Sequence, residues 1–262
     1  MSGPDLAALL EFAAELAERA GRLALRYYRT ELEVERKADD SPVTAADREI
    51  ERLLRVEVER RFPGDGIIGE EYGMTRAAAR RVWMFDPIDG TRTFVRGVPF
   101  FGTMIALVEA GEPLLGVIHL PALGETVCAA RGEGCLSNGA KAQVSPVGDL
   151  DRALIVTTDA ERMECAPRAG GWERIRRGAG LCRTWGDCYG YALVATGRAE
   201  AMIDPALNVW DAAAIFPIVE EAGGIVTDLE GLRRYDGGHL IATNAALSEA
   251  LRALLRGADP PG

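Results

Sequence analysis

The chain has 262 residues and a formal net charge of −10, from 30 Lys and Arg against 40 Asp and Glu. Its 48% hydrophobic and 27% charged residues are typical of a soluble globular protein that is long enough to bury a sizeable core. The acidic balance argues against nucleic acid or an anionic membrane as a partner, and an anionic substrate would require bound cations to invert the local field.

The first sixty residues predict two amphipathic helices. Apolar residues recur at helical spacing over residues 5–29, and four acidic side chains interrupt the same stretch. That stretch therefore lacks the features of a secretory signal, and we expect a cytoplasmic protein. Residues 35–43, broken by a Ser-Pro pair, predict an exposed and mobile loop. A second helix is predicted from its N-cap, Thr44, to about Arg61, with Asp47 in a capping box.

The rest of the chain predicts two kinds of sheet. Short β-type runs between residues 66 and 130 are separated by Gly and Pro breakers, which favours a largely antiparallel sheet, and Asn138-Gly139 predicts a tight turn. From about residue 150, strands alternate with helices, which indicates an α/β layer. We expect residues 1–148 to form an α+β subdomain with a metal site. Residues 149–262 would form an α/β subdomain that sets substrate specificity, within one compact catalytic unit.

Several carboxylates follow apolar runs. Asp86 and Asp89 follow VWMF, Glu70 and Glu71 follow GIIG, and Asp204 and Asp211 follow AMI and NVW. Taken singly, each is an ordinary turn or cap residue. Taken together they suit a hard divalent cation, which prefers oxygen ligands. With two histidines and no CxxC pair, a zinc site is poorly supported.

The Asp-Pro-Ile-Asp spacing is the sharpest of these signals. A turn at this point would let both carboxylates and the carbonyl of Ile88 face one point, and Pro87 would stiffen it. Gly90 and Thr91 then open a predicted helix, whose free N–H groups suit a phosphate. The stretch therefore predicts cation ligands beside a phosphate site.

Four segments together resemble the inositol monophosphatase family of Mg²⁺-dependent, lithium-sensitive phosphatases. They are PVTAADREIE (42–51), GEE (69–71), WMFDPIDGTRTF (83–94) and WDAAAIFPIVEEAGG (210–224). The resemblance extends from about residue 5 to residue 255. It implies a layered αβαβα sandwich of the inositol monophosphatase and fructose-bisphosphatase type. It also implies a homodimer, without locating its interface.

The same resemblance implies roles for individual residues. One Mg²⁺ would be held by Glu70, Asp86 and the Ile88 carbonyl, and a second by Asp86, Asp89 and Asp211. A weaker third ion or its water would lie near Glu71 and Asp47. Asp47 and Thr91 would activate the attacking water, with Glu71 beside them. A helix first-turn charge remains an alternative for Asp47, and a solvated lysine for Lys37, which also matches a family position.

The substrate depends on residues 183–211. Asp187 follows Gly186 where inositol-specific relatives usually carry a small or hydroxyl residue, and Asp204 occupies a second substrate position. Two carboxylates favour a cationic alcohol, because charge-assisted hydrogen bonds are about twice as strong as neutral ones. L-Histidinol phosphate carries an ammonium and an imidazole, and parts of the sequence resemble the histidinol-phosphatase branch. Asp187 could instead cap a helix, and Arg183 could reach the phosphate or a neighbouring acid.

The expected function is hydrolysis of L-histidinol phosphate, a small-molecule phosphate ester, as a step of histidine biosynthesis. The expected substrate contacts are Ile88, Asp89, Gly90, Thr91, Arg183, Gly186, Asp187 and Asp204. A broad inositol-1-monophosphatase is the alternative within the class. A regulatory binding protein of the same fold is the alternative from another class, and retention of every expected metal ligand counts against it.

Overall fold

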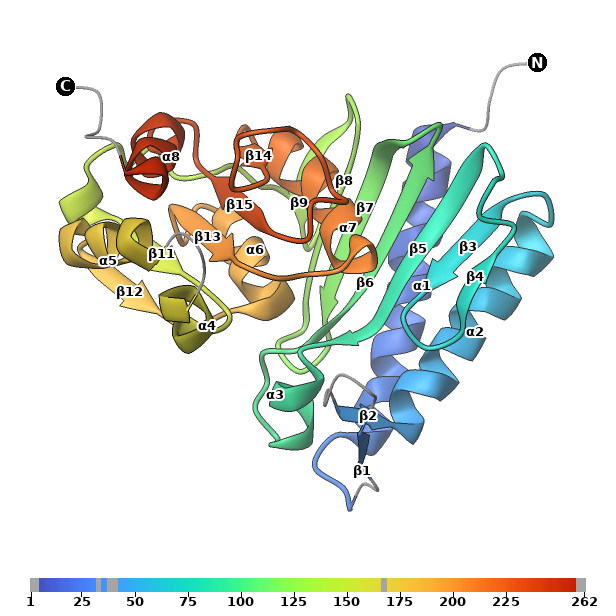
Figure 1. Ribbon diagram of the computed structural model, residues 1–262. Helices are drawn as coiled ribbons and strands as arrows, with labels where there is room; N and C mark the ends of the chain where they lie inside the picture. The colour runs from blue at the N-terminus through green and yellow to red at the C-terminus, as the bar shows by residue number, and fades with distance from the viewer. Residues whose placement is uncertain (1–4, 32–33, 37–41, 166–168, 258–262) are drawn as a thin grey trace.

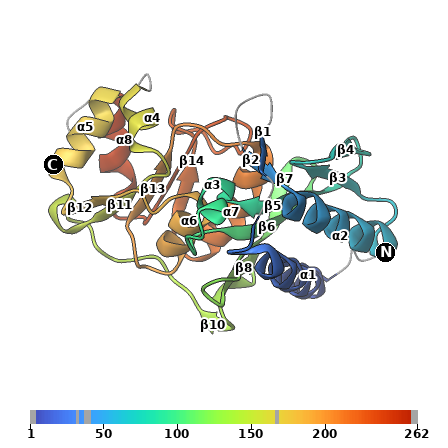
Figure 2. The same ribbon diagram turned by 90° about the horizontal axis from the view of Figure 1, so that it is seen from below.

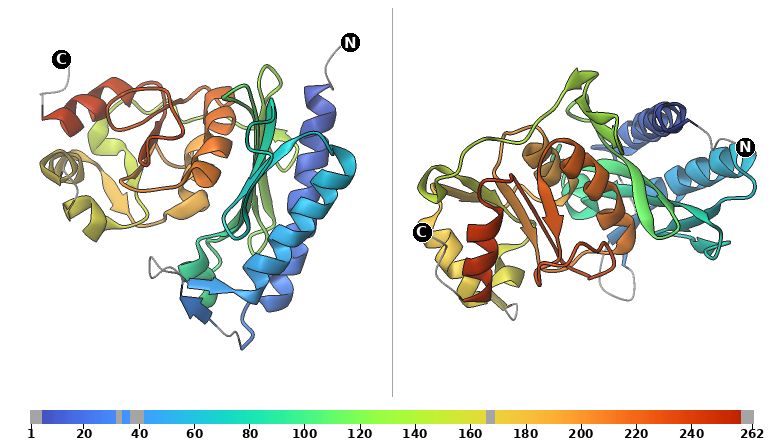
Figure 3. Two further views of the ribbon diagram at one scale, coloured as in Figure 1. Left: turned by 45° about the vertical axis from the view of Figure 1, so that its right-hand side comes forward. Right: turned by 90° about the horizontal axis from the view of Figure 1, so that it is seen from above.

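A computed structural model describes residues 5–31, 34–36, 42–165 and 169–257. Two main sheets and three layers of helices alternate in it, which confirms the predicted αβαβα arrangement (Figure 1). Helices α1 (Leu6–Tyr27) and α2 (Ala45–Arg61) form one outer layer. Helices α6 (Asp187–Ala195) and α7 (Val209–Glu221) lie between the sheets. The other outer layer holds α4 (Ala160–Cys165), α5 (Ala169–Gly178) and α8 (Ser248–Arg256), as the views in Figures 2 and 3 show.

The large sheet has eight strands in the order β10-β9-β8-β7-β6-β5-β3-β4. All its pairs are antiparallel except β3 with β5. Its strands are β3 (Gly66–Gly69), β4 (Gly73–Thr75), β5 (Arg81–Asp89), β6 (Gly102–Glu109), β7 (Glu112–Leu120), β8 (Glu125–Ala130), β9 (Gly134–Ser137) and β10 (Ala140–Lys141). Asn138 and Gly139 both have positive φ between β9 and β10, which confirms the predicted tight turn.

The small sheet has five strands in the order β12-β11-β13-β15-β14, with parallel and antiparallel pairs. They are β11 (Leu154–Val156), β12 (Leu181–Arg183), β13 (Ala201–Asp204), β14 (Ile225–Thr227) and β15 (Leu240–Thr243). The expected division after residue 148 falls between the two sheets. It does not divide the core, because one apolar cluster packs Met84 and Ile118 of the large sheet with Phe216 of α7 and Met202 of β13.

Strand β5 shows how alternation builds the layers. Trp83 and Phe85 are fully buried in the cluster beneath α1 and α2, whereas Val82 and Met84 belong to the cluster around α7. Successive side chains of a strand point to opposite faces, so the next residue of the second set, Asp86, faces α7. The strand therefore aims a carboxylate into the layer between the sheets.

Two local predictions differ from the structure. Within the range 35–43, the described residues contribute to two short antiparallel strands, β1 (Val34–Arg36) and β2 (Pro42–Thr44), where we predicted a loop. Glu35 pairs there with Arg48 of α2 at 2.6 Å. Asp86-Pro87 is also not a turn, because β5 continues to Asp89 with a shift of register opposite β6. Pro87 lacks the N–H that a regular ladder needs, and this causes an irregularity rather than a strand end.

Helix α2 begins as predicted. The side chain of Thr44 accepts from the helix start, and Asp47 accepts from the Thr44 backbone N–H at 2.8 Å, completing the capping box. Elements β4, α4, α5 and β12 were not predicted from the sequence. No helix in the described part of the chain has both the length and the apolar composition needed to cross a lipid bilayer.

Candidate active site

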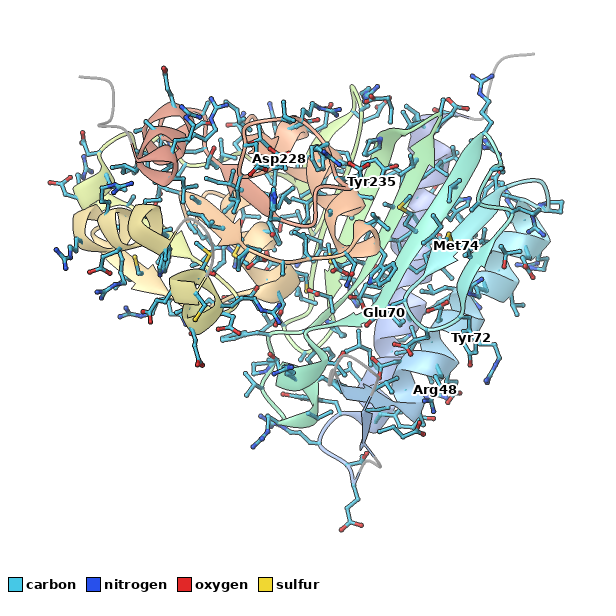
Figure 4. All side chains as sticks on the ribbon, viewed as in Figure 1. Arg48, Glu70, Tyr72, Met74, Asp228 and Tyr235 are labelled. Atoms are coloured by element: carbon cyan, nitrogen blue, oxygen red, sulfur yellow. The ribbon has the colours of Figure 1, made fainter. Side chains whose placement is uncertain are left out.

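The parallel pairing of β3 with β5 brings the first two acids together. Gly69 pairs with Phe85, so the residues that follow them, Glu70 and Asp86, lie side by side at one edge of the large sheet. Figure 4 shows Glu70 at this end of the sheet. The backbone N–H of Glu70 donates to the carbonyl of Phe85 at 3.3 Å, one residue beyond the ladder. The register of the two paired strands is enough to place these residues next to each other.

Asp89 and Asp211 complete a cluster of three carboxylates with Asp86. One oxygen of each lies within 4.8 Å of the others. Asp211 is the third residue of α7 and caps it, accepting from the Asn208 N–H at 2.8 Å. Asp89 accepts from the backbone N–H of Cys188, at the start of α6. The last four residues of β5 thus supply two of the ligand groups, and the start of α7 supplies the third.

The electrostatics of this cluster fit a bound cation. The Oδ1 atoms of Asp86 and Asp211 are buried and meet no hydrogen-bond donor among the described residues. Burial and the neighbouring carboxylates raise the pKa of Asp86 well above its usual range, while burial chiefly raises the pKa of Asp89 and of Asp211 to about 7 each. Buried carboxylates without donors are costly unless a cation offsets them. The all-oxygen donor set suits Mg²⁺.

Beside the carboxylates, the chain turns sharply at Gly90 into the short helix α3 (Thr91–Val95). Gly90 has φ +82°, and a Cβ there would lie 3.0 Å from Asp187 Oδ2. Thr91 Oγ1 donates to the Ile88 carbonyl at 2.9 Å and lies 3.5 Å from Asp47 Oδ1. Burial raises the pKa of Asp47 to about 6. The hydroxyl of Thr91 therefore lies next to a carboxylate, that of Asp47, whose pKa is close to neutral pH.

The three carboxylates, Gly90 and Thr91 line a cleft of about 360 Å³ between the large sheet and the C-terminal half, whereas Asp47 and Ile88 are buried behind it. Such a volume suits a small metabolite. The predicted residues that line it are Glu70, Asp86, Asp89, Gly90, Thr91, Asp187 and Asp211. Six acidic side chains and two arginines face the cleft, so a phosphate ester would meet net negative charge unless cations were bound there.

Asp187 has an unusual backbone. It opens α6 with φ +52°, a region that residues other than Gly, Asn and Asp rarely occupy. Its N–H donates to Thr158 Oγ1 at 2.9 Å, and its Oδ2 atom accepts from Thr93 Oγ1 at 3.3 Å. Burial and the charge of Asp89 raise its pKa well above the usual range. The strained conformation directs the carboxylate into the cleft instead of onto the helix end.

The structure does not bring every predicted residue to the cleft. Asp204 is 4% exposed, and its oxygens accept from Thr158 N–H at 3.0 Å and Tyr191 O–H at 2.8 Å. It therefore lies behind the cleft wall rather than in it. Arg183 is exposed on the edge strand β12 and donates to the Cys182 carbonyl.

Three further predicted residues support the site or lie outside it. Glu71 does not line the cleft in the described part of the chain, although its neighbour Glu70 does. Gly186 packs against Thr158, whose Cα would lie 2.1 Å from any Cβ placed on it. It borders a second hollow, lined partly by Phe100 and Trp185, that shares Asp187 with the cleft. Lys37 lies outside the described residues.

Several residues that line the cleft were not predicted from the sequence, among them Thr158, Arg92 and Arg162. Thr158 follows β11, and residues after strand ends commonly form sites in α/β layers, so its position carried a usable signal. Arg162 belongs to α4, which was not predicted. Arg92 lies inside the WMFDPIDGTRTF motif, but the sequence does not show where its side chain points.

Comparison with known proteins agrees with this geometry. The model of the inositol monophosphatase family matches residues 5–258. Histidinol-phosphatase of Chlorobaculum parvum is 46% identical over 248 residues, which is 94% of this chain and 96% of that protein. Histidinol-phosphatase of Mycobacterium tuberculosis is 39% identical, covering 92% of this chain and 95% of that protein.

A solved structure of an inositol monophosphatase from Zymomonas mobilis superposes with a TM-score of 0.87 at 35% identity, covering 97% of this chain and 100% of that one. Fold and sequence similarity thus agree along nearly the whole chain. The chain belongs to the inositol monophosphatase family and is a phosphatase, a phosphoric monoester hydrolase.

Proposed function

We propose that the chain hydrolyses L-histidinol phosphate to L-histidinol and phosphate, with Mg²⁺ as cofactor. The observation that carries the choice of substrate is the Asp187 carboxylate, held in the cleft beside the Gly90 turn by a backbone conformation that few residues adopt. The two relatives described above, both histidinol-phosphatases by name, support the same choice.

Glu70, Asp86, Asp89 and Asp211, with the Ile88 carbonyl, would hold two Mg²⁺ ions. The orphaned oxygens of Asp86 and Asp211 fit this role. Bound Mg²⁺ supplies a water of lowered pKa and neutralises charge on the phosphate and the leaving alkoxide. A third, more weakly bound ion would lie near Asp47 and Glu71.

The chain's own residues orient the attacking water and accept its proton. Thr91 Oγ1 is placed to accept a hydrogen bond from water, and its own proton would turn from the Ile88 carbonyl toward Asp47 Oδ1, 3.5 Å away. Asp47, with its pKa raised to about 6, is mostly ionised at neutral pH and can take up a proton there. The water oxygen forms the new bond to phosphorus, the ester oxygen leaves, and that alkoxide takes a proton to become the alcohol.

Asp187 would bind the cationic end of the substrate. An ammonium in the cleft would form a charge-assisted hydrogen bond with this carboxylate, whereas an inositol ring would offer only neutral hydroxyls. Binding of the cation would also favour the ionised form of Asp187, against the burial that raises its pKa.

The direct test is phosphate release from L-histidinol phosphate and from inositol 1-phosphate, each with Mg²⁺ and with a chelator. We expect kcat/KM for histidinol phosphate to be at least tenfold higher, about 1.4 kcal/mol of transition-state binding, and both activities to require Mg²⁺. Equal or faster turnover of inositol 1-phosphate would favour the alternative that the Zymomonas mobilis structure suggests, an inositol monophosphatase. Only the absence of Mg²⁺-dependent phosphate release from a whole panel of phosphate esters would favour a regulatory binding protein.

A further inference from the structure

A second acid on α2 lies beneath the turn that carries Glu70. Glu51 is fully buried, one helical turn after Asp47. Its Oε2 atom accepts from the backbone N–H of Glu71 at 2.6 Å, and its Oε1 atom accepts from the N–H of Tyr72 at 3.1 Å. One carboxylate thus binds the two backbone amides that follow a proposed metal ligand.

Arg55 completes this arrangement. Its Nε atom donates to Glu51 Oε1 at 2.7 Å, so the buried charge is paired. The rest of the guanidinium donates to Thr75 Oγ1 at 3.2 Å and to the carbonyl of Gly73. Buried ion pairs of this kind are weak evidence for stability, because desolvation offsets much of the attraction. The hydrogen bonds from this ion pair to the turn therefore point to a role in holding the turn in place, in addition to any role in folding.

Gly69 makes room for the carboxylate. A Cβ at this position would lie 2.1 Å from Glu51 Oε1 and 2.4 Å from its Cδ, so any side chain would displace Glu51. Since Glu51 is inside the fold and not at its surface, it has no open space to move into. A substitution at Gly69 would thus disturb the contact without changing any charge.

The turn joins β3 to β4, which pair from Gly69 and Gly73 onward, and Glu51 binds its backbone from inside the fold. The Glu70 N–H to the Phe85 carbonyl is a long hydrogen bond at 3.3 Å, whereas the amides of Glu71 and Tyr72 are held by Glu51. Figure 4 shows Glu70 at the end of the sheet, with Tyr72 and Met74 following toward the outer strand. Helix α2 therefore holds Asp47 beside Thr91 and, one turn later, holds the turn that carries Glu70.

We propose that Glu51 and Arg55 are positioning residues that fix Glu70 in its metal-binding orientation and so set the Mg²⁺ affinity of the site. The proposal rests on the metal site described under the proposed function, but not on which ester is hydrolysed. Residues that orient metal ligands commonly change metal affinity by 10- to 100-fold when they are mutated.

The test is calorimetric titration of Mg²⁺ into metal-free protein without substrate. Glu51→Gln, Arg55→Lys and Gly69→Ala should each weaken Mg²⁺ binding by about tenfold or more, with kcat at saturating Mg²⁺ within about threefold of wild type. Glu57→Gln is the matched control. It removes another Arg-paired glutamate of α2, bonded to Arg19 and Arg60, away from this turn. It should bind Mg²⁺ as wild type does.

Thermal melts of the metal-free variants separate positioning from folding. Variants that melt cooperatively yet bind Mg²⁺ weakly support the proposal, and Gly69→Ala or Arg55→Lys keeps it testable if Glu51→Gln does not fold. Wild-type Mg²⁺ affinity in folded Glu51→Gln and Gly69→Ala would overturn it. Failure of the wild-type protein itself to bind Mg²⁺ would overturn the metal site, and this proposal with it, whatever the substrate.

Discussion

Asp86 of β5 and Asp211 of α7 approach each other from two different layers, and each buries a carboxylate oxygen that meets no donor in the described part of the chain. The alternation of β5 and the capping box of α7 fix these directions independently. In the absence of a cation, the two like charges oppose folding. The arrangement that suits a cation therefore lowers the stability of the metal-free protein.

Neutralising one of these acids should lower the activity of the enzyme and raise the stability of the metal-free protein. Asp211→Asn keeps an oxygen that can accept from the Asn208 N–H and removes a charge from the cluster. We expect at least a 100-fold loss of kcat/KM and, in chelator near neutral pH, a gain of about 1 to 3 kcal/mol in the free energy of unfolding. Chemical denaturation and phosphate release measure the two effects. A loss of stability in chelator would contradict the electrostatic account.

The same cluster predicts how pH changes the effect of Mg²⁺ on stability. The pKa values of Asp89 and Asp211 are raised to about 7, from an ordinary value near 4. The metal-free folded state then binds more protons than the unfolded state between about pH 4 and pH 7, so stability falls as pH rises through that window. Bound Mg²⁺ favours the ionised forms and should remove this loss.

Melting temperatures measured in chelator and in saturating Mg²⁺, at about pH 6 and about pH 8, test this prediction. The increase caused by Mg²⁺ should be larger at the higher pH. Asp211→Asn should reduce the difference between the two pH values. An increase that is the same at both would show that these carboxylates do not titrate between them.

Much of the fold follows from local patterns. Helical spacing, the Thr44 capping box and the Asn138-Gly139 turn each depend on a few adjacent residues, and the structure confirms all three. Helix α5 does not follow from its sequence, which begins Ala-Gly-Gly, because glycine disfavours helices. It is stabilised by tertiary packing of Trp172 and Ile175 against the core, which no local pattern shows.

The site was predictable to the same extent. Glu70, Asp86, Asp89 and Asp211 belong to motifs at element ends, and the cleft contains all four. Asp204 belongs to a strand end too, but its direction depends on Tyr191, thirteen residues earlier on α6. Packing between elements decides whether an acid at a strand end faces a cleft or a buried hydroxyl. The spacing of residues in the sequence does not show which of the two it faces.

Tyr191→Phe tests what Asp204 does. The change leaves Asp204 Oδ2 buried without its donor, and an unsatisfied buried acceptor costs about 1 to 3 kcal/mol. We expect a stability loss of that size and an unchanged ratio of kcat/KM values for histidinol phosphate and inositol 1-phosphate. Denaturant unfolding and the two assays measure these quantities. A changed ratio at wild-type stability would place Asp204 among the substrate contacts after all.

Asp187→Asn tests the residue on which substrate choice depends. Asparagine tolerates positive φ and keeps the shape of the side chain, so the variant removes the charge without the backbone strain that serine would meet at φ +52°. We expect kcat/KM for histidinol phosphate to fall about 10- to 100-fold, with inositol 1-phosphate within about threefold of wild type.

The matched control for Asp187→Asn is Asp159→Asn, which removes a negative charge from another residue that lines the same cleft. If the field of the cleft alone selected the cationic substrate, both variants should lose histidinol phosphate turnover to a similar degree. A direct ammonium contact predicts a selective loss at Asp187 only. An equal loss for both esters in Asp187→Asn would mean that this carboxylate supports the adjacent Gly90 turn, where a Cβ would lie 3.0 Å from Asp187 Oδ2.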